Sequence, residues 1–246
     1  MSEPLRTAPT ISLVIPAYNE EKYIGDCLLY ALKNGNGKFL EIIVIDNAST
    51  DNTKEVAERF EGVRVVREDK KGLTAARQRG FLEAKGDVLA FVDADTQMPE
   101  SWATRVATEF TTADNLACLS GPYVYHDTSR LQRFVAKWFY WRLLAMPMYF
   151  FLGYMAVGGN FAIKRNVIER MGGFDTSIEF YGEDTNIARR AHEFGKVKFT
   201  LSLAMPTSGR RMASQGVIKT ATIYVLNFLS EVTLKRPATR EYTDIR

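Results

Sequence analysis

Residues 88–96 read V-L-A-F-V-D-A-D-T, an apolar run that ends in two carboxylates one residue apart. Five apolar residues followed at once by charged ones are typical of a buried strand that ends at the edge of a sheet. Two negative charges at such an edge are either solvated side chains of a loop or ligands that await a positive partner. The rest of the chain decides between these two interpretations.

The residues before this stretch alternate between apolar runs and helical patterns. Strands are expected at residues 11–15, 41–45 and 63–66, and helices at 19–33, from 51 onward and at 72–85. Continuous apolar strands separated by helices predict a parallel sheet that is covered on both faces. The connections of such a sheet are right-handed almost without exception.

The second half of the chain is less regular, and it contains neither repeats nor a low-complexity linker. We expect helices at residues 99–110, 129–151, 183–194 and 213–234, and strands at 116–125, 159–164 and 197–201. Nothing in this pattern divides the chain into independent units. The prediction is therefore an α/β fold in a single domain, residues 1–246.

The bulk composition narrows the class of protein. The chain has 246 residues, of which 46% are hydrophobic and 25% charged, and this composition is that of a globular domain. A net charge of +3 is too small to indicate a nucleic-acid partner. Cys27 and Cys118 are expected as buried thiols in a reducing compartment. Because the first ten residues are polar and the apolar stretch 143–157 is short for a spanning helix, we expect a cytoplasmic protein, soluble or peripheral.

Acidic side chains follow three of the predicted strands. Their ends carry residues 16–20 (P-A-Y-N-E), 46–51 (D-N-A-S-T-D) and 93–95 (D-A-D). In open parallel sheets, ligands bind beyond the carboxyl ends of the strands. Asp51 alone is as typical of a helix cap, but three converging acidic ends favour a binding site.

The motifs for direct phosphate binding are missing from the sequence. Neither G-x-G-x-x-G nor G-x-x-x-x-G-K-[ST] occurs, so a dinucleotide fold and a phosphate-loop NTPase are disfavoured. A carboxylate approaches a phosphate only through a cation between them. Oxygen ligands select Mg²⁺ or Mn²⁺, whereas the two histidines and two cysteines have no zinc-site spacing.

Five blocks of sequence resemble the inverting family-2 glycosyltransferases of the GT-A fold. They are V-I-P-A-Y-N-E-E (14–21), I-I-V-I-D-N-A-S-T-D-N-T (42–53), G-L-T-A-A-R-Q-R-G (72–80), D-V-L-A-F-V-D-A-D-T (87–96) and G-G-F-D (172–175) with G-E-D (182–184). The resemblance implies a Rossmann-like, mostly parallel central sheet flanked by helices. It also implies a metal-dependent transferase that takes a sugar from a UDP- or GDP-linked donor. Residues 11–97 would then form the nucleotide-binding half, 98–205 the acceptor and catalytic half, and 206–246 a basic loop with an amphipathic helix.

The resemblance also implies roles for individual residues. Asp46 would contact the nucleotide base, and Asp93 would contact the ribose. Arg77 would face the diphosphate. Asp95 together with Asp93 would bind the Mn²⁺ or Mg²⁺ ion. The implied nucleotide-sugar site comprises Pro16, Ala17, Tyr18, Glu20, Asp46, Asn47, Arg77, Asp93, Ala94, Gly159, Asn160, Arg210 and Arg211. Gln78 stands where the family often has Asn. Gly158 and Gly159 would allow the backbone to approach the sugar, or simply form a turn.

Two positions depart from the family or have a plain structural alternative. Many relatives carry a metal-binding histidine near residues 207–211, and this chain has none. Arg210 and Arg211 would neutralise the diphosphate there, or belong to a solvated loop. Asp184 resembles the catalytic base and Glu183 a partner on the acceptor side, since a hydroxyl needs a carboxylate to take its proton. The alternative is that both acids only favour a helix N-terminus.

Basic residues alternate with aromatic ones over 130–151, and the closing helix is apolar with a basic end. Both segments either pack on the sheet or meet the inner face of a membrane, and in the second case a glycan acceptor would be lipid-linked. Three rival functions stay open. They are transfer to a polyprenyl phosphate, as in dolichyl-phosphate mannose synthase-like enzymes, a sugar nucleotidyltransferase, and a membrane-associated binding module without activity.

Overall fold

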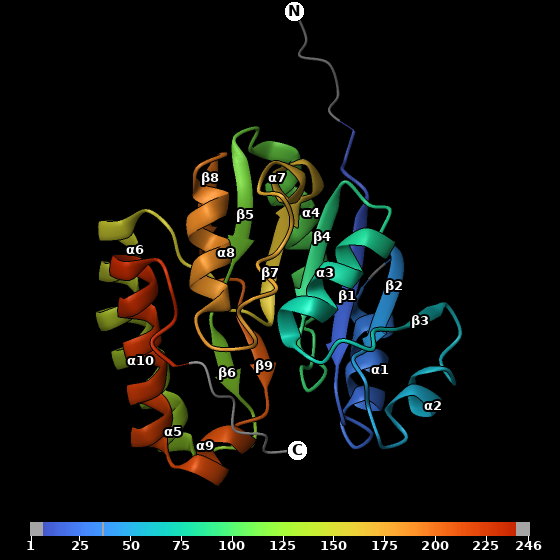
Figure 1. Ribbon diagram of the computed structural model, residues 1–246, viewed down its shortest axis with the longest axis horizontal. Helices are drawn as coiled ribbons and strands as arrows, with labels where there is room; N and C mark the ends of the chain where they lie inside the picture. The colour runs from blue at the N-terminus through green and yellow to red at the C-terminus, as the bar shows by residue number, and fades with distance from the viewer. Residues whose placement is uncertain (1–6, 36, 240–246) are drawn as a thin grey trace, which may run out of the picture.

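The computed structural model describes residues 7–35 and 37–239, and its centre is a seven-stranded sheet (Figure 1). The strand order is β3-β2-β1-β4-β7-β5-β8. All neighbouring pairs are parallel except those of β7, which runs antiparallel to β4 and to β5. The prediction of a mostly parallel sheet is therefore confirmed. The strands are β1 (Ile11–Ala17), β2 (Phe39–Asp46), β3 (Val63–Arg67), β4 (Val88–Val92), β5 (Leu116–Ser120), β7 (Asn160–Lys164) and β8 (Lys196–Phe199).

Helices cover both faces of the sheet because successive side chains of a strand point to opposite faces and are apolar on both. Leu13 and Ile15 of β1 pack into the core cluster under one set of helices, and Val14 between them packs into the other cluster. The first face carries α1 (Ile24–Asn34), α2 (Thr53–Ala57) and α4 (Trp102–Thr112), and the second carries α3 (Leu73–Glu83), α7 (Arg165–Arg170) and α8 (Glu183–His192). Both cysteines are free and buried, as predicted.

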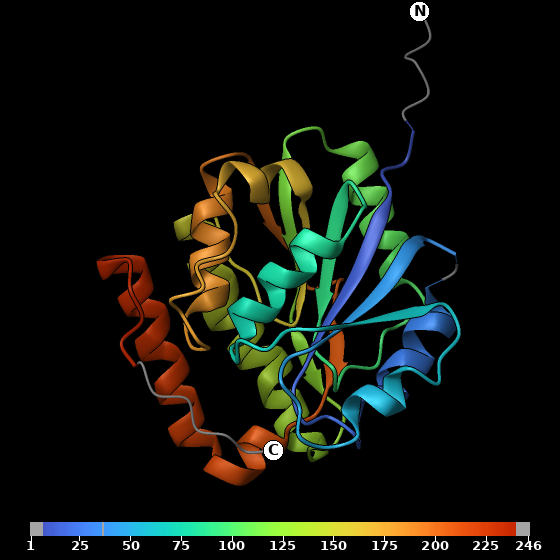
Figure 2. The same ribbon diagram turned by 45° about the vertical axis from the view of Figure 1, so that its right-hand side comes forward.

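A further group of helices lies outside these layers. It comprises α5 (Arg130–Val135), the π-helix η1 (Ala136–Ala145), α6 (Met146–Leu152), α9 (Arg210–Gln215) and α10 (Val217–Leu234). Trp141 of η1 stacks on Phe199 of β8 at 5.7 Å between ring centroids, and Phe228 of α10 packs against the same cluster. In both views α10 lies at the edge of the molecule, on the side away from β2 and β3 (Figures 1 and 2).

Two predicted elements are wrong in their extent. The strand expected at 116–125 is two strands, β5 and β6 (Tyr123–Tyr125), and β6 joins β9 (Met205–Thr207) in a separate small sheet. The break falls at Gly121, where a Cβ would lie 2.3 Å from the Leu203 carbonyl oxygen. The closing helix is likewise divided into α9 and α10 at Gly216, whose φ of +83° favours glycine.

The reversed strand β7 determines how the site is assembled. Because β7 is antiparallel to β4, its first residue, Asn160, pairs with Val92, the last residue of β4. The segment before β7 therefore arrives beside the D-A-D stretch that follows β4. Residues that are distant in sequence thus meet at the carboxyl edge of the parallel strands.

Candidate active site

Asp93 and Asp95 follow β4, and the residue between them explains their spacing. The Ala94 side chain is buried in the core cluster beneath α1 and α4, so only its backbone is left for the predicted contact with a donor. The flanking carboxylates have polar partners instead. Asp93 Oδ2 accepts a hydrogen bond from the Tyr123 hydroxyl at 2.6 Å, and Asp95 Oδ1 accepts one from the Thr207 hydroxyl at 3.0 Å.

The carboxylate of Asp95 lies in a crowded acidic environment. Burial raises its pKa to about 7; the Arg210 guanidinium opposes this shift, and the carboxylates of Asp93 and Glu20 add to it. Arg210 Nη2 lies 3.2 Å from Asp95 Oδ2. Arg210 also forms a fork on Glu20, with distances of 2.7 and 2.5 Å between nitrogen and oxygen. Its side chain is 20% exposed, so Arg210 is not part of a solvated loop.

A second pair of acids opens helix α8. Glu183 is buried and lies 2.9 Å from Nη1 of Arg77, whose side chain is only 1% exposed. Burial raises the pKa of Glu183 to about 8, and Arg77 opposes that shift. Burial likewise raises the pKa of Asp184, which also accepts a hydrogen bond from the Thr185 N–H at 2.7 Å.

The predicted contact of Arg77 with the diphosphate stays a prediction. In the structure its guanidinium is enclosed by protein. There it pairs with Glu183 and donates a hydrogen bond to the Gly158 carbonyl oxygen at 2.6 Å. Because the Arg77 side chain is almost fully buried, its positive charge does not reach the protein surface. Its position makes it the counter-charge of the acids at α8.

The two adjacent glycines before β7 bring both acidic pairs together. A Cβ on Gly158 would lie 2.3 Å from Glu183 Oε1, and a Cβ on Gly159 would lie 2.0 Å from the Tyr123 hydroxyl and 2.1 Å from Asp93 Cγ. Real Cβ contacts are essentially never so short, so a larger residue at either position would displace Glu183, or Tyr123 and Asp93. One site therefore contains both acidic pairs.

The side chain of Asn160 has a structural role, and its predicted contact with a donor stays a prediction. Its side chain is fully buried, and its amide nitrogen donates to the carbonyl oxygens of Gly121 at 2.9 Å and Leu203 at 2.7 Å. Its amide oxygen accepts from the Trp102 indole N–H at 2.8 Å. These bonds hold the corner where β5 ends and β7 begins.

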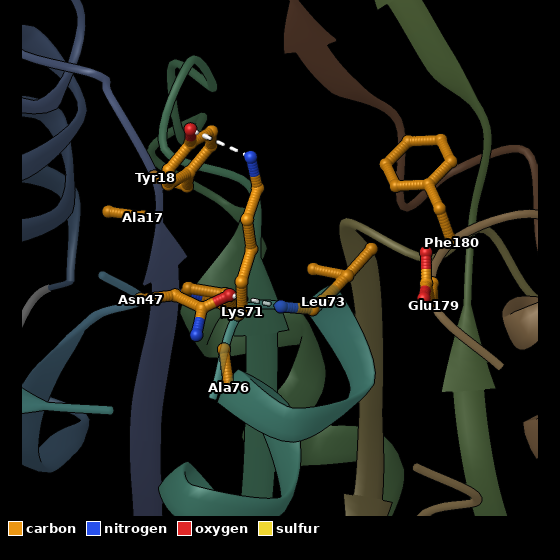
Figure 3. A pocket seen from close by; sticks show the side chains of 10 residues that line it. Ala17, Tyr18, Asn47, Lys71, Leu73, Ala76, Glu179 and Phe180 are labelled. Carbon is orange, nitrogen blue, oxygen red and sulfur yellow. Dashed lines mark hydrogen bonds between the residues drawn. The ribbon is translucent and has the colours of Figure 1, made fainter. Parts of the chain in front are cut away.

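A pocket opens beyond the ends of β1 and β2 (Figure 3). Four of the predicted residues line it, namely Pro16, Ala17, Tyr18 and Asn47. The other residues that line the pocket were not predicted from the sequence. They are Lys71, Gly72, Leu73, Ala76, Glu179 and Phe180. Lys71 Nζ donates to the Tyr18 hydroxyl at 2.8 Å and lies 4.0 Å from the centre of the ring. Figure 3 shows Glu179 and Phe180 across the pocket from Tyr18 and Lys71.

Asn47 and Asp46 differ in their relation to this pocket. Asn47 accepts a hydrogen bond from Gly72 N–H at 2.8 Å and donates to the Lys70 carbonyl oxygen at 2.7 Å, so it fixes the loop that forms one wall. Asp46 is fully buried, and its carboxylate accepts from Arg67 at 2.6 Å and from Ser49 N–H at 3.2 Å. In this arrangement Asp46 supports the pocket floor and does not line it.

The carboxylate oxygens at this site suit a metal ion that a bound diphosphate also coordinates. Among residues 7–35 and 37–239, no three His, Cys, Asp or Glu side chains gather into a metal cage. Asp95 and Asp93 nevertheless provide carboxylate oxygens at the rim of the site. Mg²⁺ is usually held by one or two carboxylates together with substrate phosphates and water. The residues present therefore fit a divalent ion that a diphosphate helps to bind.

A Rossmann-like sheet with a D-x-D element at its edge and a second acidic pair beside it defines a glycosyltransferase of the GT-A class. The family model "Glycosyl transferase family 2" matches residues 12–172. The chain belongs to this family.

Individual relatives agree with this assignment. The chain is 28% identical over 221 residues to "Probable glycosyltransferase YdaM" of Bacillus subtilis, covering 78% of this chain and 49% of the relative. It is 31% identical over 174 residues to "Dolichol-phosphate mannosyltransferase" of Pyrococcus furiosus, covering 65% and 47%. The chain therefore spans about half the length of these curated relatives.

Solved structures share the fold. The mannosyltransferase PcManGT from Pyrobaculum calidifontis, in complex with GDP-Man and Mn²⁺, matches with a TM-score of 0.69 at 20% identity, covering 96% of this chain and 66% of that one. The glucosyl-3-phosphoglycerate synthase of Mycobacterium tuberculosis, in complex with Mn²⁺, UDP and phosphoglyceric acid, matches with a TM-score of 0.63 at 20% identity, covering 92% and 78%.

Proposed function

We propose that this chain transfers a sugar from a UDP- or GDP-linked donor to a hydroxyl acceptor, with inversion at the anomeric carbon. The observation that supports this most is the pair of acidic groups on adjacent glycines. The Asp93 carboxylate lies against Gly159, and the Glu183 carboxylate lies against Gly158. A donor-binding carboxylate and Glu183, the neighbour of the candidate base Asp184, therefore belong to one site.

The chain's own residues would divide the work as follows. Tyr18, Asn47 and Lys71 line the pocket in which the nucleotide would bind. Asp95 and Asp93 would hold Mn²⁺ or Mg²⁺, which supplies positive charge against the leaving diphosphate. Asp184 would take the proton of the acceptor hydroxyl. Its raised pKa makes it a better base than an ordinary aspartate, provided that it is ionised.

A polyprenyl phosphate acceptor is the second candidate. It is supported by the similarity to a dolichol-phosphate mannosyltransferase over 65% of the chain. A phosphate is ionised at neutral pH and needs no base. The two candidates therefore differ in how much they depend on Asp184.

Thermal denaturation with UDP, GDP, CDP and dTDP, each with and without Mn²⁺, tests the donor site. A nucleotide at about 100 times its Kd is expected to raise the unfolding free energy by about 2.7 kcal/mol. We expect this gain with one nucleotide, only when Mn²⁺ is present, and not in Asp95→Asn. If no nucleotide shifts the melting temperature of the wild type, the proposed donor site is wrong.

The outer helices support an acceptor that is presented at a membrane surface. No described helix is both long and apolar enough to cross a bilayer. Yet these helices expose many large apolar side chains: Phe134, Trp138, Phe139, Leu143, Leu144, Phe150, Phe151, Val217, Val225, Leu226, Leu229 and Leu234. Because exposed apolar patches mark interaction sites in soluble proteins, these side chains favour such a site on the outer helices.

The charges on these helices favour an anionic surface. Residues 130–152 contain no acidic residue, and residues 217–234 contain only Glu231, which is buried against Arg189. Arg142 lies 4.5 Å from the Trp138 ring centre, a pairing suited to the headgroup level of a bilayer. Burial raises the pKa values of Tyr140 on η1 and Tyr224 on α10, and the Asp184 carboxylate adds to both shifts. α10 also contacts α8, which carries the proposed base, because Asn186 Nδ2 donates to Glu231 Oε1 at 2.9 Å. A cytoplasmic location on the inner face of a membrane remains a prediction.

Co-sedimentation with vesicles of phosphatidylglycerol and phosphatidylcholine tests this surface. Phe150 and Phe151 are 74% and 85% exposed, so a double change to serine should leave the fold intact. We expect it to weaken vesicle binding at least tenfold, because burying one such ring contributes roughly 1.5–3 kcal/mol. Leu82→Ser on α3, also exposed, is the matched control. Failure of the wild type to bind at low salt would contradict the proposal.

A further inference from the structure

Arg210 lies at the point where the proposed function needs a metal ion. Its guanidinium contacts Asp95 Oδ2 at 3.2 Å while it forks onto Glu20, and it lies 4.6 Å from the Tyr23 ring centre. The other oxygen of Asp95 accepts from Thr207. Both oxygens of this carboxylate therefore have a partner from one segment, β9 and the start of α9.

The backbone of that segment is well anchored near Asp95. β9 pairs with β6 along its length, and Thr207 also forms a bridge with Thr96 next to Asp95. Arg210 lies three residues after Thr207 and is the first residue of α9. Because the backbone is fixed and the side chain is long, the guanidinium is the part free to change partners.

The Arg210 guanidinium and a divalent ion compete for Asp95. Mg²⁺ binds oxygen ligands at roughly 2.0–2.1 Å in a near-octahedral geometry, and the positive charge of a guanidinium 3.2 Å from the same carboxylate would repel an ion bound there. Glu20 offers Arg210 a second carboxylate, so the guanidinium has somewhere to remain when Asp95 is taken. A diphosphate would supply a further anion for the same fork.

We propose that Arg210 is the resident counter-ion of Asp95 in the nucleotide-free protein, and that a divalent ion replaces it only when a nucleoside diphosphate binds. This inference rests on the proposed donor site. Metal and nucleotide then bind cooperatively, because each favours the state in which Arg210 has left Asp95. By linkage, the nucleotide tightens metal binding by the same factor as the metal tightens nucleotide binding.

Mn²⁺ titration followed by electron paramagnetic resonance tests this arrangement without any transfer assay. In the absence of nucleotide, we expect Arg210→Gln to bind Mn²⁺ roughly 10- to 100-fold more tightly than the wild type, a range usual for coupled sites. The matched control is Arg170→Gln on α7, because the Arg170 guanidinium lies 4.5 Å from the Phe194 ring centre and belongs to no part of the proposed site. Adding Asp95→Asn to Arg210→Gln should abolish the gain.

Removing Arg210 also removes the fork that holds the buried carboxylate of Glu20. The double variant Glu20→Gln/Arg210→Gln avoids leaving that charge without its partner, and it should show the same gain in Mn²⁺ affinity. Equal Mn²⁺ affinity in the wild type and in both folded variants would overturn the proposal. If UDP and GDP change Mn²⁺ affinity in none of the proteins, the proposed donor site fails, whereas the nucleotide-free titration still reports on Arg210.

Discussion

Replacing Asp184 by Asn is expected to lower transfer to a hydroxyl acceptor by roughly 10²- to 10⁴-fold, the usual contribution of a general base. The amide has nearly the same shape, so donor binding should persist. In the wild type, burial raises the pKa of Asp184, and the base acts only when it is unprotonated. The rate should therefore fall as the pH falls through that raised pKa, and this acid limb should vanish in the variant. Initial rates across pH at saturating donor measure both effects.

The same variant separates the two candidate acceptors. If the acceptor is a polyprenyl phosphate, Asp184→Asn should keep most of its activity, because an ionised phosphate needs no base. Asp87→Asn is the matched control, since Asp87 precedes β4 at the opposite edge of the sheet and binds Thr10. An equal loss in the control would mean that the effect is not specific to the base.

Replacing Arg77 by Gln is expected to lower the unfolding free energy by about 3–5 kcal/mol above about pH 8, where Glu183 is ionised, because one member of a buried ion pair is then left alone. Arg77 is 1% exposed and contacts buried Glu183 at 2.9 Å. For a chain of this size the melting temperature should fall by roughly 2–4 °C for each kcal/mol. Urea unfolding of the ligand-free protein measures the change.

Two further variants show whether the pairing itself is the cause. Arg79→Gln changes the same helix at an exposed i,i+4 pair with Glu83 and should cost under about 0.5 kcal/mol. The double variant Arg77→Gln/Glu183→Gln leaves no unpaired buried charge and should regain much of the loss. If the double variant is no more stable than Arg77→Gln, the buried charge is not what destabilises it.

The first half of the fold was predictable because its signals are local. β1, β2 and β4 are largely apolar runs, and α1 has a periodic apolar face. The second half depends on contacts that no local pattern records. Tyr123–Tyr125 looks like a continuation of β5, and only its pairing with β9 separates it. β9 itself is three residues long and contains Pro206, so it carries no strand signal.

The candidate site was predictable as a set of acids but not as a set of contacts. The sequence indicated Asp93, Asp95, Glu183 and Asp184, and the structure brings both pairs to Gly158 and Gly159. It did not indicate that Arg77 would be enclosed, or that Asn160 would use its amide within the core. Residues such as Tyr123 and Thr207 belong to no motif, and only the fold places them beside the carboxylates.

The separation of partners along the chain has a consequence for biosynthesis. Glu20 and Arg210 are 190 residues apart, and Asp95 and Thr207 are 112 apart. At synthesis rates of about 5–20 residues per second, Glu20 leaves the ribosome roughly 10–40 s before the arginine that pairs with it. A nascent chain therefore carries its acidic edge without these partners until β9 and α9 have emerged. Retention on an immobilised nucleotide should accordingly distinguish finished chains from truncated ones.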